Sequence, residues 1–224
     1  MRERDLTDFA FRTVPTAELT ASDRDVMQGL FATNYRQANA AYLEKSFGTL
    51  GFAAIATHDD VPAGFALGEM RILDLPRLPG QTVALAGMCC INPSFRRRGL
   101  FGALELAALR GADFVPVGRY LSAGRMAHPA SMRTMARNAT VVPKPGVPIT
   151  AWQREVGRAI AAAYRTQQFD DETFVCVGSG TPIGYPVMDI EAEPEEWRVF
   201  EPVNRDRGDS LLGLCWHPDA PDGW

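Results

Sequence analysis

The sequence lacks both an excess of basic residues and a long apolar run. Its 224 residues include 23 Lys and Arg against 27 Asp and Glu, which gives a formal net charge of −4. Because nucleic acids and anionic membranes are bound through basic surfaces, we expect no nucleic acid and no membrane among the partners. No stretch approaches the roughly 20 apolar residues that span a bilayer, and the charged residues 1–8 do not resemble a signal peptide. We therefore expect a cytoplasmic protein.

Cysteine and histidine are also scarce. Cys89, Cys90, Cys176 and Cys215 do not have the spacing of zinc ligands, so no metal site is expected. The adjacent Cys89 and Cys90 would point to opposite faces of a strand. Reduced, buried cysteines are therefore the favoured interpretation, and a disulfide is the alternative.

Apolar residues, by contrast, are abundant. Hydrophobic residues make up 46% and charged residues 22%, which is enough for a sizeable core and excludes global disorder. The length suits one large domain, or one domain that carries an insertion. Residues 143–148 are rich in proline and predict a linker or rigid turn.

Local patterns predict an alternation of strands and helices. Strands are predicted at residues 9–14, 52–57, 63–73, 82–92, 114–121, 174–177, 197–202 and 210–216. Helices are predicted at residues 20–35, 39–50, 99–110 and 129–138, with a further one after Thr150. Residues 75–81 and 178–186 are predicted loops. Hairpins are expected around residues 58–62 and, between the last two strands, around residues 204–209.

The helix after Thr150 has a clear local pattern. Thr150 and Gln153 have the spacing of a capping box, in which each side chain bonds the backbone N–H of the other residue. An apolar stripe follows at four-residue spacing, made of Trp152, Val156, Ile160 and Tyr164. Such a stripe more often packs into a core than binds a ligand.

Residues 90–104 carry the most specific pattern in the chain. A buried strand ends at Asn92 and a helix opens near Gly99, so successive backbone N–H groups of the loop converge where an anion can bind. Gly99 lets the backbone approach a phosphate closely, and the three arginines at 96–98 add positive charge. The glycine and lysine spacings of a Walker loop and of a dinucleotide fingerprint are absent. The pattern therefore predicts a phosphate-binding loop of another kind.

This segment resembles the signature of the GCN5-related N-acetyltransferase (GNAT) superfamily. That signature is an apolar strand ending in Val/Ile-x-Pro, followed by Gln/Arg-x-x-Gly-x-Gly/Ala at the start of a helix. The chain has Ile91-x-Pro93 and then Arg96-x-x-Gly99-x-Phe101, so Phe101 departs from the last small position. The predicted order of strands and helices over about residues 9 to 140 is similar to that family as well.

The resemblance implies an α/β (α+β) fold with a central mixed, mostly antiparallel sheet, splayed at the signature strand, and helices on both faces. It implies one acyltransferase domain over residues 1–224, with an insertion atypical of the family at about 143–196. Coenzyme A would pair its pantetheine arm with the strand end and place its pyrophosphate on the loop backbone, and an N–H near Cys90 or Ile91 would polarise the thioester carbonyl. The implied coenzyme A residues are Cys89, Cys90, Ile91, Arg96, Arg97, Arg98, Gly99, Leu100, Phe101 and Gly102.

The usual acid and base of the family are missing from their positions. Leu85 stands where histone-type members have a glutamate base, and Met135 stands where many members have a tyrosine acid. Glu69 is the candidate base, because it interrupts an apolar strand and its pKa would rise if it faced the cleft; a polar position on an alternating strand is the alternative. Tyr120 and His128 are the nearest candidates for the acid, and relayed water is the rival to all three.

The resulting hypothesis is an enzyme, an N-acetyltransferase that moves an acyl group, acetyl in the simplest case, from acetyl-CoA to the amine of a small molecule by direct attack. Within the same class, the donor could be a longer acyl-CoA or an acyl-carrier protein. From another class, the chain could be a catalytically degenerate coenzyme A sensor or assembly protein. A homodimer is compatible with the sequence. The aromatic residues of the insertion would suit a bulky acceptor: Trp152, Tyr164, Phe169, Phe174 and Tyr185.

Overall fold

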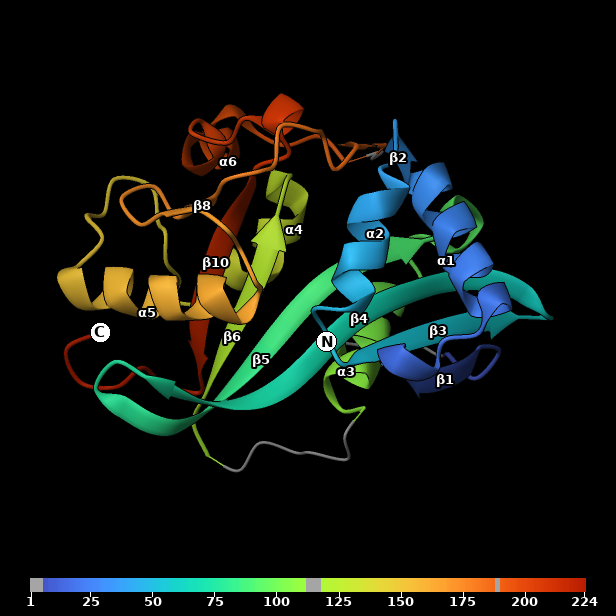
Figure 1. Ribbon diagram of the computed structural model, residues 1–224, viewed down its shortest axis with the longest axis horizontal. Coiled ribbons are helices and arrows are strands. Elements are labelled where there is room, and N and C mark those ends of the chain that lie inside the picture. The colour runs from blue at the N-terminus through green and yellow to red at the C-terminus, as the bar shows by residue number, and fades with distance from the viewer. Residues whose placement is uncertain (1–5, 112–117, 188–189) are drawn as a thin grey trace. The chain divides into compact units, whose positions relative to one another are not determined.

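The computed structural model describes residues 6–111, 118–187 and 190–224, and the chain divides into two compact units. The first unit comprises Met1–Met70 and Ala86–Val115, and the second comprises Arg71–Leu85 and Pro116–Trp224. Strands β4 (Val61–Leu75) and β5 (Leu78–Ile91) form a long hairpin that contributes residues to both units (Figure 1).

Eight strands form one mixed sheet, which is mostly antiparallel with one parallel pair. In sheet order the strands are β1 (Ala10–Pro15), β3 (Phe52–His58), β4, β5, β6 (Tyr120–Met126), β10 (Ser210–His217), β8 (Val175–Cys176) and β7 (Phe169–Asp170). Two further short strands are β2 (Tyr35–Arg36) and β9 (Tyr185–Pro186). The predicted α/β (α+β) class with a mixed, mostly antiparallel sheet is confirmed.

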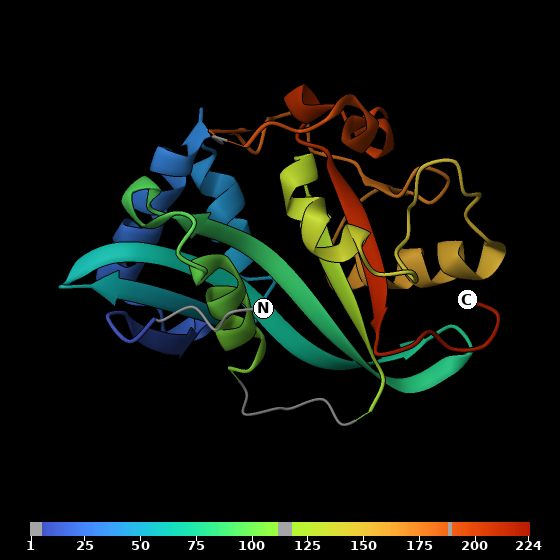
Figure 2. The same cartoon turned by 180° about the vertical axis from the view of Figure 1, so that it is seen from behind.

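In the first unit, helices cover both faces of the strands. Helices α1 (Ala21–Asn34) and α2 (Ala40–Phe47) lie on one face, and α3 (Leu100–Leu109) lies on the other (Figures 1 and 2). Alanines on β3 and β4 let α3 approach the strands closely. This part of the core consists of Phe9, Ala54, Ala56, Ala63, Ala66, Leu100, Leu104 and Ala108.

Side-chain caps fix the starts of the first two helices. The Thr20 side chain accepts a hydrogen bond from the backbone N–H of Asp23, and the Asp23 carboxylate accepts from the backbone N–H of Thr20. Asn39 caps α2 by accepting from the N–H of Tyr42 (3.2 Å). Each cap satisfies helix N–H groups that have no partner within the helix, so the predicted helix starts are confirmed.

The predictions for the two turns that follow β3 and β4 had different outcomes. The hairpin between β3 and β4 is confirmed, and its turn is formed by Asp59 and Asp60, whose φ angles of 47° and 61° suit short polar side chains. The loop predicted at residues 75–81 is wrong, because β4 continues to Leu75 and β5 begins at Leu78. Pro76 and Arg77 (φ 66°) alone make that turn, so strand pairing continues past the later proline and glycine.

In the second unit, β10 is the central strand. It pairs antiparallel with β6 and with β8, and its residues from Ser210 to Trp216 are all buried. Helices α4 (Pro129–Ala136) and α5 (Ala151–Ala163) lie on opposite faces of this strand (Figures 1 and 2). Burial on both faces explains why the sequence of β10 is apolar almost without interruption.

Two strand predictions in the second unit need correction. The strand predicted at residues 114–121 begins at Tyr120 and runs to Met126, while residues 112–117 lie outside the described part of the chain. Residues 197–202 are not a strand: helix α6 (Pro194–Trp197) is followed there by the 3₁₀ turn Arg198–Phe200. Pro at the first helical position and the acidic first turn favour this helix locally, and β10 pairs with β6 and β8 instead.

The predicted helix α5 and its capping box are confirmed. Thr150 accepts from the N–H of Gln153 (3.2 Å), and Gln153 accepts from the N–H of Thr150 (3.0 Å). Its aromatic stripe is buried: Trp152 and Tyr164 are 6% and 4% exposed, and the Tyr164 hydroxyl donates to the carbonyl of Ala123 (2.9 Å). These two side chains therefore build the core of the second unit.

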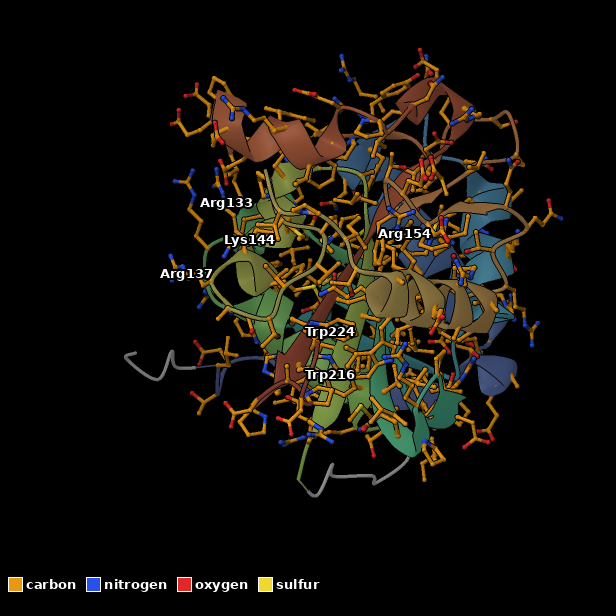
Figure 3. The ribbon with its side chains drawn as sticks, turned by 90° about the vertical axis from the view of Figure 1, so that its left-hand side faces the viewer. Arg133, Arg137, Lys144, Arg154, Trp216 and Trp224 are labelled. Atoms are coloured by element: carbon orange, nitrogen blue, oxygen red, sulfur yellow. The ribbon has the colours of Figure 1, made fainter. Side chains whose placement is uncertain are left out.

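Aromatic side chains elsewhere in this unit also serve packing. Trp224 meets Trp216 edge-on, with ring centres 5.5 Å apart (Figure 3). The ring centre of Trp224 also lies 5.7 Å from that of Trp152. Phe174 is fully buried and meets Phe169 at 5.5 Å. The prediction that the aromatic residues of 143–196 line an acceptor site is therefore wrong for Trp152, Tyr164 and Phe174, because side chains this deeply buried cannot contact an acceptor.

All four cysteines are free thiols, as expected. No helix within the described residues is long and apolar enough to cross a membrane. The same part of the chain contains no group of three or more His, Cys, Asp or Glu side chains that could hold a metal ion.

Candidate functional site

The loop between β5 and α3 turns at two residues with left-handed backbone conformation. Arg97 has a φ of 65° and Gly99 a φ of 100°, and Gly99 is the N-cap of α3. The loop starts at Asn92, whose side chain accepts from the N–H of Ser94 (3.1 Å) and donates to the carbonyl of Pro62 (2.9 Å). The φ of Arg97 lies in the left-handed region that other residues occasionally adopt, whereas the φ of 100° at Gly99 lies beyond it, so this position favours the glycine of the sequence pattern.

Two of the loop arginines are held by side chains of the first unit. Arg96 Nη2 donates to Oδ1 of Asn34, the last residue of α1, at 3.1 Å. The Arg98 guanidinium lies 4.8 Å from the ring centre of Phe9 and 3.8 Å from the carboxylate of Asp8. These contacts fix the loop and keep positive charge beside the N-terminus of α3.

The first turn of α3 presents backbone N–H groups rather than side-chain caps. Gly99 has no side chain, and the described residues supply no other side-chain cap to this helix. Leu100 is buried, Phe101 is half-buried and Gly102 is exposed. A helix N-terminus of this kind, flanked by arginines, can bind a phosphate through its N–H groups. The structure therefore places the seven residues from Arg96 to Gly102 in one continuous turn that leads into the first turn of α3.

The end of β5 provides the strand positions predicted to meet the pantetheine arm. Burial raises the pKa of Cys89 well above its ordinary value, and the nearby Glu105 carboxylate raises it further. Burial also raises the pKa of Cys90, against an opposing effect of Arg96. Both side chains are therefore protonated thiols at neutral pH, which makes them poor nucleophiles. The next residue, Ile91, packs against the core formed by α3 and the strands.

Glu105 is a titratable residue that sequence reasoning missed. It lies on α3, it is half-buried, and burial raises its pKa from 4.5 to about 7. Within the described residues its carboxylate has no hydrogen bond, so desolvation is unopposed. The sequence did contain a sign of it, because Glu105 is the one charged residue in an otherwise apolar helix, Leu100–Leu109.

Glu69 lies on β4 in the same unit. Its carboxylate accepts a hydrogen bond from the backbone N–H of Gly51 at 2.9 Å, just before the start of β3. The contact is close, because a Cβ on Gly51 would lie 3.0 Å from the carboxyl carbon. Glu69 is half-buried, and this hydrogen bond holds its carboxylate against the neighbouring strand.

Tyr120 and His128 belong to the second unit and are not brought to one site. Tyr120 is the first residue of β6 and stacks on His217, with ring centres 5.0 Å apart and 19° between the planes. His128 follows the other end of β6 and caps α4, where Nδ1 accepts from the N–H of Ala130 at 3.1 Å. The mostly extended chain between Tyr120 and His128 spans roughly 25 Å.

Both histidines of this unit are neutral near pH 7. Burial lowers the pKa of His128, and the charges of Arg205 and Arg133 lower it further. Burial also lowers the pKa of His217, whose Nε2 lies 3.3 Å from Sγ of Cys215. Because Nδ1 of His128 accepts a hydrogen bond, the ring proton of that neutral imidazole lies on Nε2.

No family model and no curated protein matches the chain. Among solved structures, the ribosomal-protein-S18-alanine N-acetyltransferase from Escherichia coli is 12% identical, with 96% of this chain and 99% of that chain covered and a TM-score of 0.43. An aminoglycoside acetyltransferase from an uncultured soil metagenomic sample is 13% identical over 45% of this chain and 67% of that chain, with a TM-score of 0.33. The aminoglycoside N-acetyltransferase AAC(6')-Iy, in complex with CoA, is 24% identical over 47% of this chain and 69% of that chain, with a TM-score of 0.32. The chain is thus similar to several acetyltransferases at low TM-scores, and the functional assignment rests on the loop residues themselves.

Proposed function

We propose that this chain is an N-acetyltransferase of the GNAT type, which binds acetyl-CoA and transfers the acetyl group to an amine. The observation that carries the proposal is the turn from Arg96 to Gly102. It combines a left-handed glycine N-cap, an uncapped helix N-terminus and anchored arginines in the position that the signature Ile91-x-Pro93 and Arg96-x-x-Gly99 requires.

In the proposed reaction the neutral amine attacks the carbonyl carbon of the thioester. A C–N bond forms, the C–S bond breaks, and coenzyme A leaves as a thiolate that takes up a proton. The amine loses one proton, so a base must receive it either directly or through water. The protonated thiols of Cys89 and Cys90 support direct attack rather than an acyl-cysteine intermediate.

For the base we propose Glu69, with Glu105 as the second carboxylate of the first unit. The hydrogen bond from Gly51 fixes Glu69, whereas burial gives Glu105 a pKa of about 7, which suits proton transfer near neutral pH. A pH–rate profile separates the two: if Glu105 is the base, kcat/KM falls below about pH 7 and Glu105→Gln abolishes that limb. If Glu69 is the base, Glu69→Gln lowers kcat/KM by roughly 100-fold and Glu105→Gln has little effect.

The coenzyme A site is tested by isothermal titration of coenzyme A into the wild type and a Gly99→Val variant. We expect the variant to bind at least about tenfold more weakly, because a β-branched side chain blocks the backbone from the pyrophosphate. Gly29→Val is the matched control, since Gly29 lies at an exposed position of α1 outside the loop and a Cβ there meets nothing within 4 Å. Unchanged affinity in a Gly99→Val protein that retains its circular dichroism spectrum would rule out the proposed site.

A second function, coenzyme A binding without catalysis, is favoured by one observation. Leu85 and Met135 occupy the positions of the usual base and acid. A mass-detected screen of amines with acetyl-CoA distinguishes the two functions. An acetylated amine establishes the enzyme, whereas coenzyme A binding with no product from any amine favours the sensor.

The remaining parts of the proposal concern the acceptor, the donor, the domain organisation and the cellular compartment. We propose a small-molecule amine as acceptor, acetyl rather than a longer acyl group as donor, and one acyltransferase domain with an insertion at about residues 143–196. The free cysteines support a reducing compartment such as the cytoplasm. The same screen, run with longer acyl-CoA donors, tests the acyl chain length.

A further inference from the structure

A small pocket lies in the second unit, away from the residues predicted to bind coenzyme A. Its volume is about 150 Å³, and it is lined by Ala127, Trp197, Phe200, Glu201, Val203 and Arg205. Three of these residues, Trp197, Phe200 and Glu201, lie in residues 197–202, which were predicted to be a strand. The helical turns there gather aromatic and charged side chains that an extended strand would have placed on alternating faces.

The aromatic wall of the pocket is held in place by neighbouring rings. The Trp197 ring meets Phe200 at 6.1 Å and 73°, and His128 at 5.0 Å and 81°. Phe200 is only 4% exposed, so this wall is anchored in the core. A cavity of about 150 Å³ can hold one benzene-sized ring. The size therefore suits a small molecule with a single apolar group.

The pocket also presents one positive and one negative side chain. The Arg205 guanidinium lies over the Trp197 ring, 4.7 Å from its centre. Within the described residues, neither Arg205 nor Glu201 forms an ion pair or a side-chain hydrogen bond, although the two stand four positions apart and line the same pocket.

Neighbouring charged residues, unlike Arg205 and Glu201, form ion pairs within the chain. Arg198 pairs with Glu195 at 3.0 Å, and Arg207 pairs with Asp209 at 2.6 Å. Arg198 and Arg207 are thus paired with carboxylates, whereas Arg205 and Glu201, which line the pocket, have no ion-pair partner within the described residues. A ligand that carries both charges would pair with both side chains, since a guanidinium binds a carboxylate and a carboxylate binds an ammonium group.

We propose that this pocket binds a free α-amino acid with an apolar side chain no larger than one aromatic ring. The carboxylate of the ligand pairs with Arg205, its ammonium group pairs with Glu201, and its side chain contacts Trp197 and Phe200. The proposal does not depend on acetyl transfer, because the pocket is built entirely from residues of the second unit.

The test uses isothermal titration without coenzyme A, so its outcome is independent of the proposed enzyme activity. The probes are L-leucine, L-phenylalanine, 3-phenylpropionate, which lacks the ammonium group, and phenethylamine, which lacks the carboxylate. We expect at least one amino acid to bind saturably, and each analogue with a single charge to bind about tenfold more weakly than L-phenylalanine, because a hydrogen-bonded charge is lost.

Two variants test which pocket side chain pairs with which charged group of the ligand. Arg205→Gln should weaken L-phenylalanine binding about tenfold and remove its advantage over phenethylamine. Glu201→Gln should remove its advantage over 3-phenylpropionate. The matched control is Arg198→Gln, whose exposed side chain pairs with Glu195 outside the pocket lining and should leave binding unchanged.

Three results would overturn the proposal, provided that circular dichroism shows each variant to be folded. The first is no binding of either amino acid. The second is equal binding of the zwitterion and its singly charged analogues. The third is L-phenylalanine binding that Arg205→Gln and Glu201→Gln leave unchanged.

Discussion

The two units each bury a carboxylate, and the two carboxylates have opposite properties. In the second unit, Asp209 is 1% exposed and accepts four hydrogen bonds: two from Arg207, at 2.8 and 2.6 Å, one from the N–H of Gly178 at 2.8 Å, and one from the N–H of Asn204 at 3.1 Å. In the first unit, Glu105 is half-buried and accepts none within the described residues.

The pKa values follow the hydrogen bonds rather than the burial alone. Burial acts to raise the pKa of both groups. At Asp209 the hydrogen bonds from Arg207 and from two backbone N–H groups outweigh burial, and the pKa falls below its ordinary value. At Glu105 nothing opposes burial, and the pKa rises to about 7. Asp209 is therefore a permanently charged anchor of its loop, whereas Glu105 changes charge in the physiological range.

The largest expected effect in this comparison is at Asp209. An Asp209→Asn variant should lose about 3 kcal/mol of unfolding free energy at pH 7, because the amide cannot accept all four hydrogen bonds and leaves Arg207 without its counter-charge. Since the folded pKa is depressed, this stabilisation is present above about pH 4 and is lost as the pH falls through the folded pKa. Urea denaturation measures the unfolding free energy of the variant, and Asp219→Asn, at an exposed position, is the control. Equal unfolding free energies for Asp209→Asn and the control at pH 7 would contradict the anchoring role.

Glu105 should show the opposite pH dependence. The folded state must ionise a buried carboxylate as the pH rises from about 4.5 to about 7, so stability from the neutral form is full below this window and is lost above it. Glu105→Gln should therefore stabilise the protein at pH 8, by at most about 3 kcal/mol, and change little at pH 4. Thermal unfolding at both pH values measures the change in stability, and Glu18→Gln, at an exposed position, is the control. A stabilisation that is equal at both pH values would indicate a packing effect instead.

The close packing beside the loop between β5 and α3 can be tested separately from the proposed binding of coenzyme A. A Cβ on Gly64 would lie 2.8 Å from the carbonyl oxygen of Cys90 and 3.0 Å from Leu104. Gly64→Ala should therefore destabilise the first unit by about 1–3 kcal/mol in urea denaturation. The matched variant is Gly102→Ala, which meets nothing and should stabilise the exposed helix position by about 0.5–1 kcal/mol. A Gly64→Ala variant as stable as the wild type, or more stable, would show that β4 and the end of β5 are not tightly packed.

The smallest expected effect concerns the cysteines. Because burial raises the thiol pKa of Cys89 and Cys90, neither should react rapidly with iodoacetamide at pH 8 in the folded protein. Replacing both with Ala should leave acetyl transfer within about tenfold of the wild type. Mass spectrometry after a short alkylation pulse measures the first expectation. Rapid labelling of either residue would indicate an activated thiolate and reopen the case for an acyl-cysteine intermediate.

The sequence by itself determined the features that depend on short stretches of chain. The capping box at Thr150, the glycine at the start of α3 and the alternation of strands and helices were all predictable, because each depends on residues a few positions apart or on local periodicity. The resemblance that points to coenzyme A also depends on one short segment, Ile91 to Phe101.

Only the tertiary structure decided the properties that depend on distant neighbours. The turn at Pro76 and Arg77 depends on pairing between two long strands, and the strand proposed at residues 197–202 proved helical because β10 found its partners elsewhere in the sheet. The pKa of Glu105 and the unpaired charges around Trp197 depend on burial and on which groups come within a few ångströms. Such distances are set by packing between segments far apart in the chain, and local sequence patterns carry no information about them.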